Sequence, residues 1–102
     1  MHEKRKFRRV PLGAVVRAES GGTPYSLDGR NISAGGMLVK TAHTAEEGST
    51  LRLEFLLPGD PNPIRVTGAV QHVSPDAYMG IRFVDLSEAD RRRIEAYVDA
   101  AP

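Results

Sequence analysis

The chain has 102 residues, of which 40% are hydrophobic and 26% are charged, and its formal net charge is +1. This length corresponds to one domain with a thin core, and the composition excludes wholesale disorder. Because there is no cysteine, a disulfide framework and a cysteine zinc site are also excluded, which fits a reducing compartment.

The charge is unevenly distributed along the chain. Residues 1–10 carry five basic side chains and one acidic one, a net charge of +4, whereas the other 92 residues carry a net charge of −3. A small anion is the natural partner of such a basic arm. The mildly acidic body would repel a long polyanion, so we expect no nucleic-acid partner.

The sequence lacks membrane and export signals. No apolar stretch approaches the roughly 18 residues that a membrane span needs. The N-terminus is charged and has no apolar signal-peptide core. We therefore expect no membrane span and a cytoplasmic location.

The first third of the chain predicts an arm and two strands. Residues 1–9 have no apolar period and predict an extended arm, and alternation predicts a strand over 12–19. Residues 25–32 fit a second strand, but Asp28-Gly29 is also a good hairpin turn, and the local sequence leaves both open.

The middle of the chain predicts short strands separated by turns. Gly35-Gly36 marks a tight bend. Alternation predicts four strands, at 37–40, 51–55, 64–73 and 79–83. His72 continues the even-numbered phase of its strand, which predicts a half-buried side chain rather than a metal ligand.

The last residues predict a capped amphipathic helix. Ser87 is a good N-cap with an acid, Asp90, at the third helical position. An apolar face is formed by Ile94, Tyr97, Val98 and Ala101. We interpret the adjacent run Arg91-Arg92-Arg93 as a solvated, salt-bridged face, because acidic residues flank it.

Short, evenly spaced strands predict an all-β fold, either a barrel or a sandwich. Closure would remove exposed strand edges, so we favour a small antiparallel β-barrel of about six strands with a C-terminal helix. The expected boundaries are 1–10 for the basic arm, 11–86 for the barrel and 87–102 for the helix.

Two polar motifs, common when taken singly, stand out from this framework. The first is Arg5-Lys6-Phe7-Arg8-Arg9, which reads R-x-x-x-R, and the second is Asn31-Ile32-Ser33-Ala34-Gly35-Gly36, which reads [D/N]-x-S-x-x-G. A guanidinium can hold a phosphate or the O6/N7 edge of guanine bidentately. An asparagine amide and a serine hydroxyl supply donors and acceptors, and glycines permit close approach.

In this order, ahead of short strands and a final helix, the motifs resemble those of the PilZ domain. The resemblance covers nearly the whole chain, from Arg5 to the last helix. It implies a bacterial second-messenger receptor whose ligand is cyclic di-GMP, with no further cofactor.

The resemblance also implies roles for individual residues. Arg5 and Arg9 would contact phosphate and guanine, and Asn31 and Ser33 would contact the other guanine and its ribose-phosphate. Gly36 would shape the turn. The resemblance adds two further residues to the site. They are Lys4, whose position is linked in the family to binding of one or two ligand molecules, and Arg8, an auxiliary residue.

Three functions remain open at the level of sequence. The first is a non-catalytic cyclic di-GMP receptor that orders its arm over the ligand and signals to a protein partner, as a monomer or homodimer. The second is an adaptor with the same fold and no nucleotide. The third, a nucleic-acid binder, lacks interleaved aromatic and basic residues in the strands. No catalytic constellation is present, and the three histidines have no metal-ligand spacing.

Overall fold

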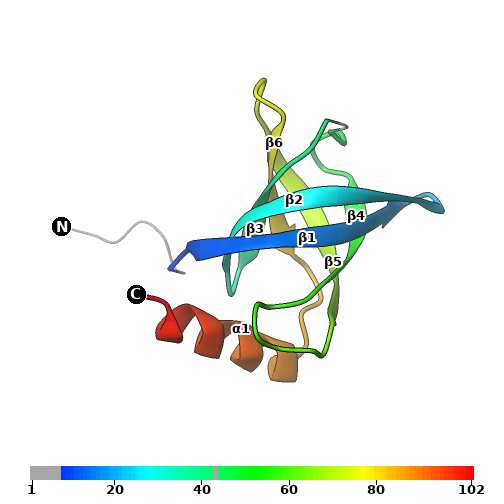
Figure 1. The fold of residues 1–102 in the computed structure, drawn as a ribbon. Helices are drawn as coiled ribbons and strands as arrows, with labels where there is room; N and C mark the ends of the chain where they lie inside the picture. The colour runs from blue at the N-terminus through cyan, green and yellow to red at the C-terminus, as the bar shows by residue number, and fades with distance from the viewer. Residues whose placement is uncertain (1–7, 43) are drawn as a thin grey trace.

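The computed structural model describes residues 8–42 and 44–102, which form six strands and a helix (Figure 1). These elements are β1 (Val10–Ser20), β2 (Thr23–Ser33), β3 (Gly36–Lys40), β4 (Thr50–Phe55), β5 (Ile64–Val73), β6 (Tyr78–Phe83) and α1 (Glu88–Ala100). The strands are antiparallel and close into a barrel in the order β1-β2-β3-β6-β5-β4. The prediction of a small all-β barrel with a C-terminal helix is therefore confirmed.

Alternating apolar residues fill the inside of the barrel. In β4, Leu51, Leu53 and Phe55 are each at most 2% exposed, while Arg52 between them is exposed. The ring of Phe55 stacks on that of Phe83 from β6, with 6.2 Å between the centroids. Because a strand places successive side chains on opposite faces, this alternation both fills the core and leaves polar groups outside.

The strand alternative is correct for residues 25–32. Asp28 lies in the middle of β2 and pairs on one side with Val15 of β1 and on the other with Lys40 of β3. A hairpin turn at Asp28-Gly29 would leave both neighbouring strands unpaired there. The local sequence could not exclude that turn, because the strands that pair with Asp28 come from an earlier and a later part of the chain.

Two register shifts change which side chains of β2 face the core near its end. The β1–β2 register shifts between Pro11 and Ala14, where Gly13 adopts a φ of 62°, and the β2–β3 register shifts between Gly29 and Asn31. A bulge adds one residue and changes which side chains face the core. After the shift the Ile32 side chain faces the core and is fully buried, so the half-buried Asn31 beside it lies on the outer side of β2.

The prediction that His72 is half-buried is wrong, because the structure leaves its side chain exposed. Val70 pairs with Ile81 and His72 pairs with the next residue, Gly80, so Gln71 is an extra residue in β5. The even-numbered inward phase of β5 therefore ends at Val70. This bulge turns His72 to the outside of the barrel.

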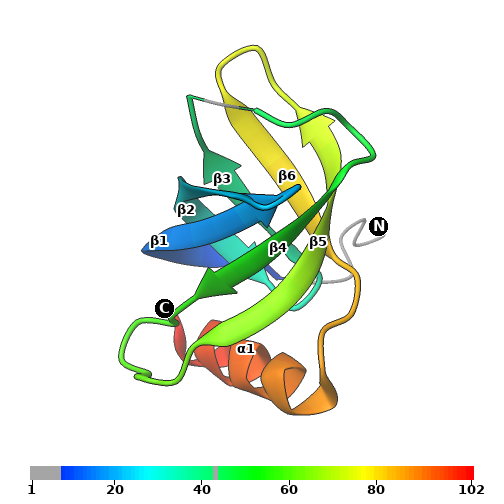
Figure 2. The ribbon, with the colours of Figure 1, turned by 90° about the vertical axis from the view of Figure 1, so that its right-hand side faces the viewer.

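Helix α1 lies across one end of the barrel (Figures 1 and 2). Its N-cap is Ser87, whose hydroxyl accepts a hydrogen bond from the Asp90 backbone N–H at 3.1 Å, as predicted. Ile94 and Val98 are buried against the barrel, with Tyr97 and Ala101 partly buried beside them. Within the described ranges, no helix has the length and apolar character to span a bilayer.

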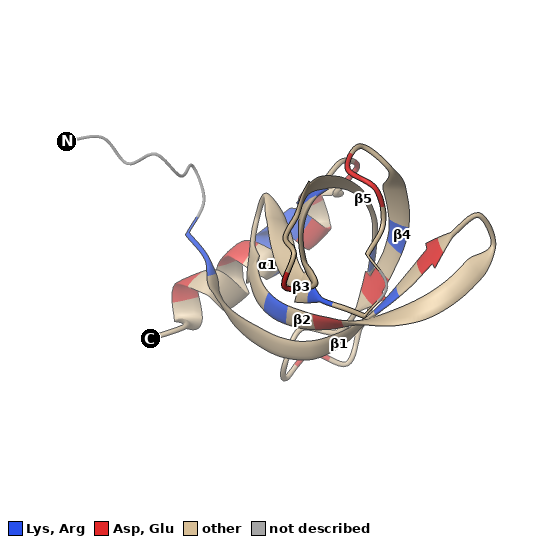
Figure 3. Ribbon diagram, turned by 90° about the horizontal axis from the view of Figure 1, so that it is seen from above, with Lys and Arg blue, Asp and Glu red and all other residues tan. Residues whose placement is uncertain are grey.

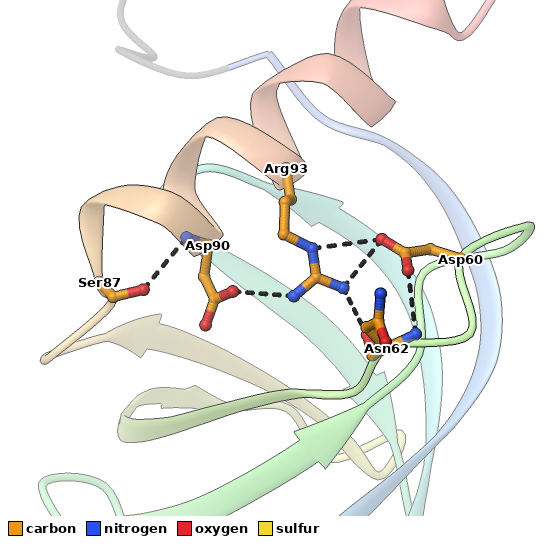
Figure 4. A network of polar contacts seen from close by, with 5 residues as sticks. All are labelled: Asp60, Asn62, Ser87, Asp90 and Arg93. Atoms are coloured by element: carbon orange, nitrogen blue, oxygen red, sulfur yellow. Dashed lines mark hydrogen bonds and ion pairs between the residues drawn. The ribbon is translucent and has the colours of Figure 1, made fainter.

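A polar network joins α1 to the loop between β4 and β5 (Figure 4). The Arg93 guanidinium donates to Asp60 Oδ2 at 2.8 and 3.2 Å and to Asp90 Oδ1 at 2.8 Å, and it also donates to the Asn62 carbonyl. The Asn62 backbone N–H donates to Asp60 Oδ1 at 2.9 Å. The pKa of the Asp60 carboxyl is lowered, mainly by the hydrogen bond from the Asn62 N–H and further by Arg93. The bonds from Arg93 to Asp60 and Asn62 hold this loop on the helix.

We expect Gly36→Ala to destabilise the fold. An added Cβ would overlap the carbonyl oxygen of Ile81 on β6, and backbone displaced by overpacking costs about 1–3 kcal/mol. Urea denaturation followed by circular dichroism measures this. Gly80→Ala is the matched control on the facing strand, since its Cβ would meet its nearest neighbour, His72 Cβ, at an ordinary 3.8 Å. Equal stability of the two variants would contradict the tight packing of Gly36 against the Ile81 carbonyl.

We expect Asp60→Ala to lower stability at pH 7 and to lose much of this effect in acid. A carboxyl whose pKa is lower in the folded state stabilises the fold above its unfolded pKa, near 3.8, and loses this contribution as pH falls through the folded value. Urea midpoints of both proteins from pH 7 to below 3.8 test the prediction. Glu54→Ala, which breaks the more exposed pair with Arg65, should change stability little. A difference for Asp60→Ala that stays constant with pH would be contrary to this account.

Candidate functional site

A hollow of about 550 Å³ lies on the outside of the barrel. Its walls come from the segment before β1, the β2–β3 turn, β3, β5, β6 and the first turn of α1. This volume is within the range of small-molecule sites. The hollow therefore brings together segments that are far apart in the sequence.

The β2–β3 turn forms one wall and carries the second motif. The Ser33 hydroxyl accepts a hydrogen bond from the Gly35 N–H at 3.1 Å, and Ser33 is only 4% exposed. The Phe83 N–H donates to the Gly35 carbonyl at 2.9 Å, which ties the turn to β6. Gly36 lies so close to Ile81 that no Cβ fits there. The turn is thus held rigidly, with Ser33 and Gly36 lining the hollow.

Arg9, the last residue of the first motif, also lines the hollow. It is exposed and precedes β1 directly. Figure 3 shows this basic segment beside the helix, at the start of β1. The register that pairs Val10 with Ile32 places Arg9 near the end of β2. The β1–β2 pairing therefore brings Arg9, at the end of the first motif, close to the second motif, which begins 22 residues later in the sequence at Asn31.

The charge of the hollow is entirely basic among the described residues. Three arginines and a histidine line it, and no aspartate or glutamate does: Arg9, His72, Arg82 and Arg91. Within the described part of the chain, none of these four side chains has a hydrogen-bond or ion-pair partner. The hollow can therefore receive an anion without displacing an internal ion pair.

A second hollow, of about 500 Å³ on the outer side of β1, β4 and β5, is different in charge. Its arginines are matched by acids, and its charged lining residues are Arg17, Glu19, Arg52, Glu54, Arg65 and Asp85. Arg65 is bound to Glu54 at 2.9 Å. This second hollow does not favour an anion, and the contrast singles out the basic one.

Asn31 lies on the outer side of β2, beside the basic hollow rather than in its lining. Its Oδ1 atom is buried and has no hydrogen-bond partner among the described residues. Buried acceptors are nearly always paired, so an orphaned one needs an explanation. A ligand donor is such an explanation.

Arg8 is directed away from the hollow toward α1. Its guanidinium donates to the carbonyls of Val98 at 3.0 Å, Ala101 at 3.2 Å and Pro102 at 3.1 Å. The last carbonyls of a helix have no partners within it, and a cation there is favourable. Arg8 thus caps α1, while Lys4 and Arg5 lie outside the described residues.

The motifs did not identify three of the basic lining residues. His72 faces outward only because of the β5 bulge, and Arg82 alternates with core residues of β6 like any exposed strand residue. Arg91 belongs to an arginine run whose other members form ion pairs with Glu88 and Asp90, as predicted, and also with Asp60, which was not predicted. A short-range pattern carries no signal for these positions. Among the described residues, no cluster of His, Asp or Glu could hold a metal ion.

Several solved structures share this fold. The Bacillus subtilis inhibitor of motility MotI matches with a TM-score of 0.83 and 20% identity, over 96% of this chain and 51% of that one. The PilZ domain of Escherichia coli YcgR with c-di-GMP matches with a TM-score of 0.76 and 15% identity, over 97% and 92%. The K. pneumonia MrkH–c-di-GMP complex matches with a TM-score of 0.74 and 21% identity, over 93% and 51%.

This chain thus spans about half the length of MotI and MrkH. At these identities the likeness establishes the fold. No curated protein sequence is significantly similar to this one. The sequence model of the PilZ domain matches residues 3–100, so this chain belongs to the PilZ domain family.

Proposed function

We propose that this PilZ domain is a non-catalytic receptor for cyclic di-GMP. The observation that carries the proposal is the basic hollow, in which Arg9, Ser33 and Gly36 from the two motifs lie together without a carboxylate. The relatives YcgR and MrkH, solved with c-di-GMP, support the same ligand class. The proposed contacts are phosphate and guanine for Arg5 and Arg9, and the second guanine and its ribose-phosphate for Asn31 and Ser33.

In this proposal the ligand orders the basic arm, residues 1–10, over the hollow. Fixing backbone costs about 1–2 kcal/mol per residue, and a hydrogen bond to a charged group returns about 1.5–3 kcal/mol. Arg8 already holds the end of the arm on α1. Micromolar affinity needs about −8 kcal/mol, so the contacts made by the arm and by the hollow together must exceed the ordering cost by that amount.

The ordered arm would signal by changing the surface that a partner protein meets. Arg8 contacts the last turn of α1, and the Tyr97 hydroxyl donates to the Pro11 carbonyl at 3.0 Å. The arm and the helix therefore share contacts on both sides of the start of β1. A change in the arm reaches the helix surface through these contacts, which makes α1 the proposed location of the response.

The adaptor without nucleotide is the second candidate, and an apolar surface favours it. Val15 is 65% exposed and Leu56 is 48% exposed. Both line a hollow of about 470 Å³ with Ala14, Phe55 and Pro63. Exposed apolar patches mark protein-binding surfaces. A domain that failed to bind the nucleotide while remaining folded would turn attention to this surface.

We expect Arg9→Ala to weaken cyclic di-GMP binding by about tenfold or more, because it removes a charge-assisted contact. Isothermal titration calorimetry of the wild type and variant measures the affinity and the stoichiometry. Arg17→Ala is the matched control, since it removes the same charge from an exposed site on β1 outside the basic hollow. No binding to folded wild-type protein, or equal affinity of the two variants, would contradict the proposal.

We expect Asn31→Ala to weaken binding without lowering stability. The variant removes a buried acceptor that has no partner in the described residues, and such a group destabilises the unliganded fold by about 1–3 kcal/mol. Affinity for the nucleotide should fall about tenfold. Ser26→Ala, on an exposed position of β2, is the control. A clear loss of stability in Asn31→Ala would show that its amide serves the fold.

A further inference from the structure

The three consecutive arginines at the start of α1 have different environments. Arg93 binds Asp60 and Asp90 at 2.8 Å, and Arg92 is 3.8 Å from Glu88 one turn earlier. Arg91 has no hydrogen-bond or ion-pair partner for its side chain within the described ranges. It is half-buried and lines the basic hollow.

The fold fixes where Arg91 lies. Its backbone N–H donates to the Ser87 carbonyl at 2.8 Å, which is the first turn of the helix after the cap. Two residues later, Arg93 anchors the helix to the β4–β5 loop (Figure 4). The next residue of the helix, Ile94, is fully buried in the core. The helix therefore cannot rotate Arg91 away from the hollow without breaking its cap, an ion pair and core packing.

The two acids that precede Arg91 in the first turn of α1 pair with other arginines. Glu88 faces Arg92 and Asp90 binds Arg93. No acid lines the hollow among the described residues, where Arg9 and Arg82 add to the positive potential. Such a potential favours an anionic group over a neutral one, and a guanidinium fork matches a phosphate.

We propose that Arg91 binds a phosphate of the nucleotide from the helix side of the hollow, as a ligand-binding residue outside both sequence motifs. This inference rests on the proposed function, which it extends. The bound nucleotide then bridges the barrel and α1, because Ser33 and Gly36 contact it from the β2–β3 turn and Arg91 contacts it from the helix.

Calorimetric titration with cyclic di-GMP tests this inference on the wild type and three variants. We expect Arg91→Ala to weaken binding about tenfold or more. Arg92→Ala removes the same charge one position away, at an exposed pair, and should stay within about twofold of the wild type. Arg91→Lys keeps the charge without the fork and should give an intermediate affinity.

A second readout separates direct contact from a structural role. Salt screens the attraction between a guanidinium and a phosphate, so affinity falls as ionic strength rises, and it falls more steeply when more charged contacts are made. Arg91→Ala should therefore reduce the salt dependence of binding, while Arg92→Ala should not. A change that acted only through the helix would lower thermal stability and leave the salt dependence unaltered.

The outcomes distinguish this inference from the proposed function. If the wild type binds, Arg9→Ala weakens binding as expected and Arg91→Ala has the same affinity as Arg92→Ala, then the role of Arg91 is overturned and the receptor proposal stands. If Arg91→Ala binds weakly but keeps the wild-type salt dependence, Arg91 is structural and the inference fails. If folded wild type does not bind cyclic di-GMP, both proposals fall together.

Discussion

The pairing of β3 with β6 is the constraint on which the rest of this structure depends. It joins residues 36–40 to residues 78–82, and the closed barrel requires it because no other strand pair links the β1–β2–β3 segment to β6. At its start Gly36 lies directly against the Ile81 carbonyl, and the Phe83 N–H binds the Gly35 carbonyl at 2.9 Å. Because the basic hollow lies over these two strands, the contact that closes the barrel also sets one wall of the candidate site. A motif glycine thus has a structural role and also lines the candidate site.

Electrostatics then distinguish this hollow from the rest of the surface. An ion pair joins β4 to β5, and two more lie in the first half of α1, whereas the hollow gathers Arg9, Arg82 and Arg91 without an acid. Unpaired cations that converge on one concave surface create a field that a dianionic nucleotide would enter favourably. The net charge of +1 gives no indication of this, because it averages the basic site with the acidic body.

The helix is held on the barrel by contacts of different kinds. Ile94 and Val98 bury its apolar face, Arg93 binds its first half to the β4–β5 loop, and Arg8 caps its last carbonyls. Arg8 directly precedes Arg9, which lines the hollow. Neighbouring residues of one motif therefore reach two different places, the ligand site and the helix. This proximity makes the helix a natural place for the domain to respond to a ligand.

The sequence by itself determined the strands, the turns, the helix and its cap, because alternation, glycine and proline positions and N-cap chemistry act over a few residues. The two motifs also identified Arg9, Ser33 and Gly36, which the fold brings into one hollow. Only the tertiary structure decided that Asp28-Gly29 lies within a strand, that His72 faces outward after a bulge, and that Arg91 enters the hollow while Arg93 binds a loop. The physical reason is the same in each case. Register and burial at these positions depend on partners contributed by distant segments, and no local pattern contains them.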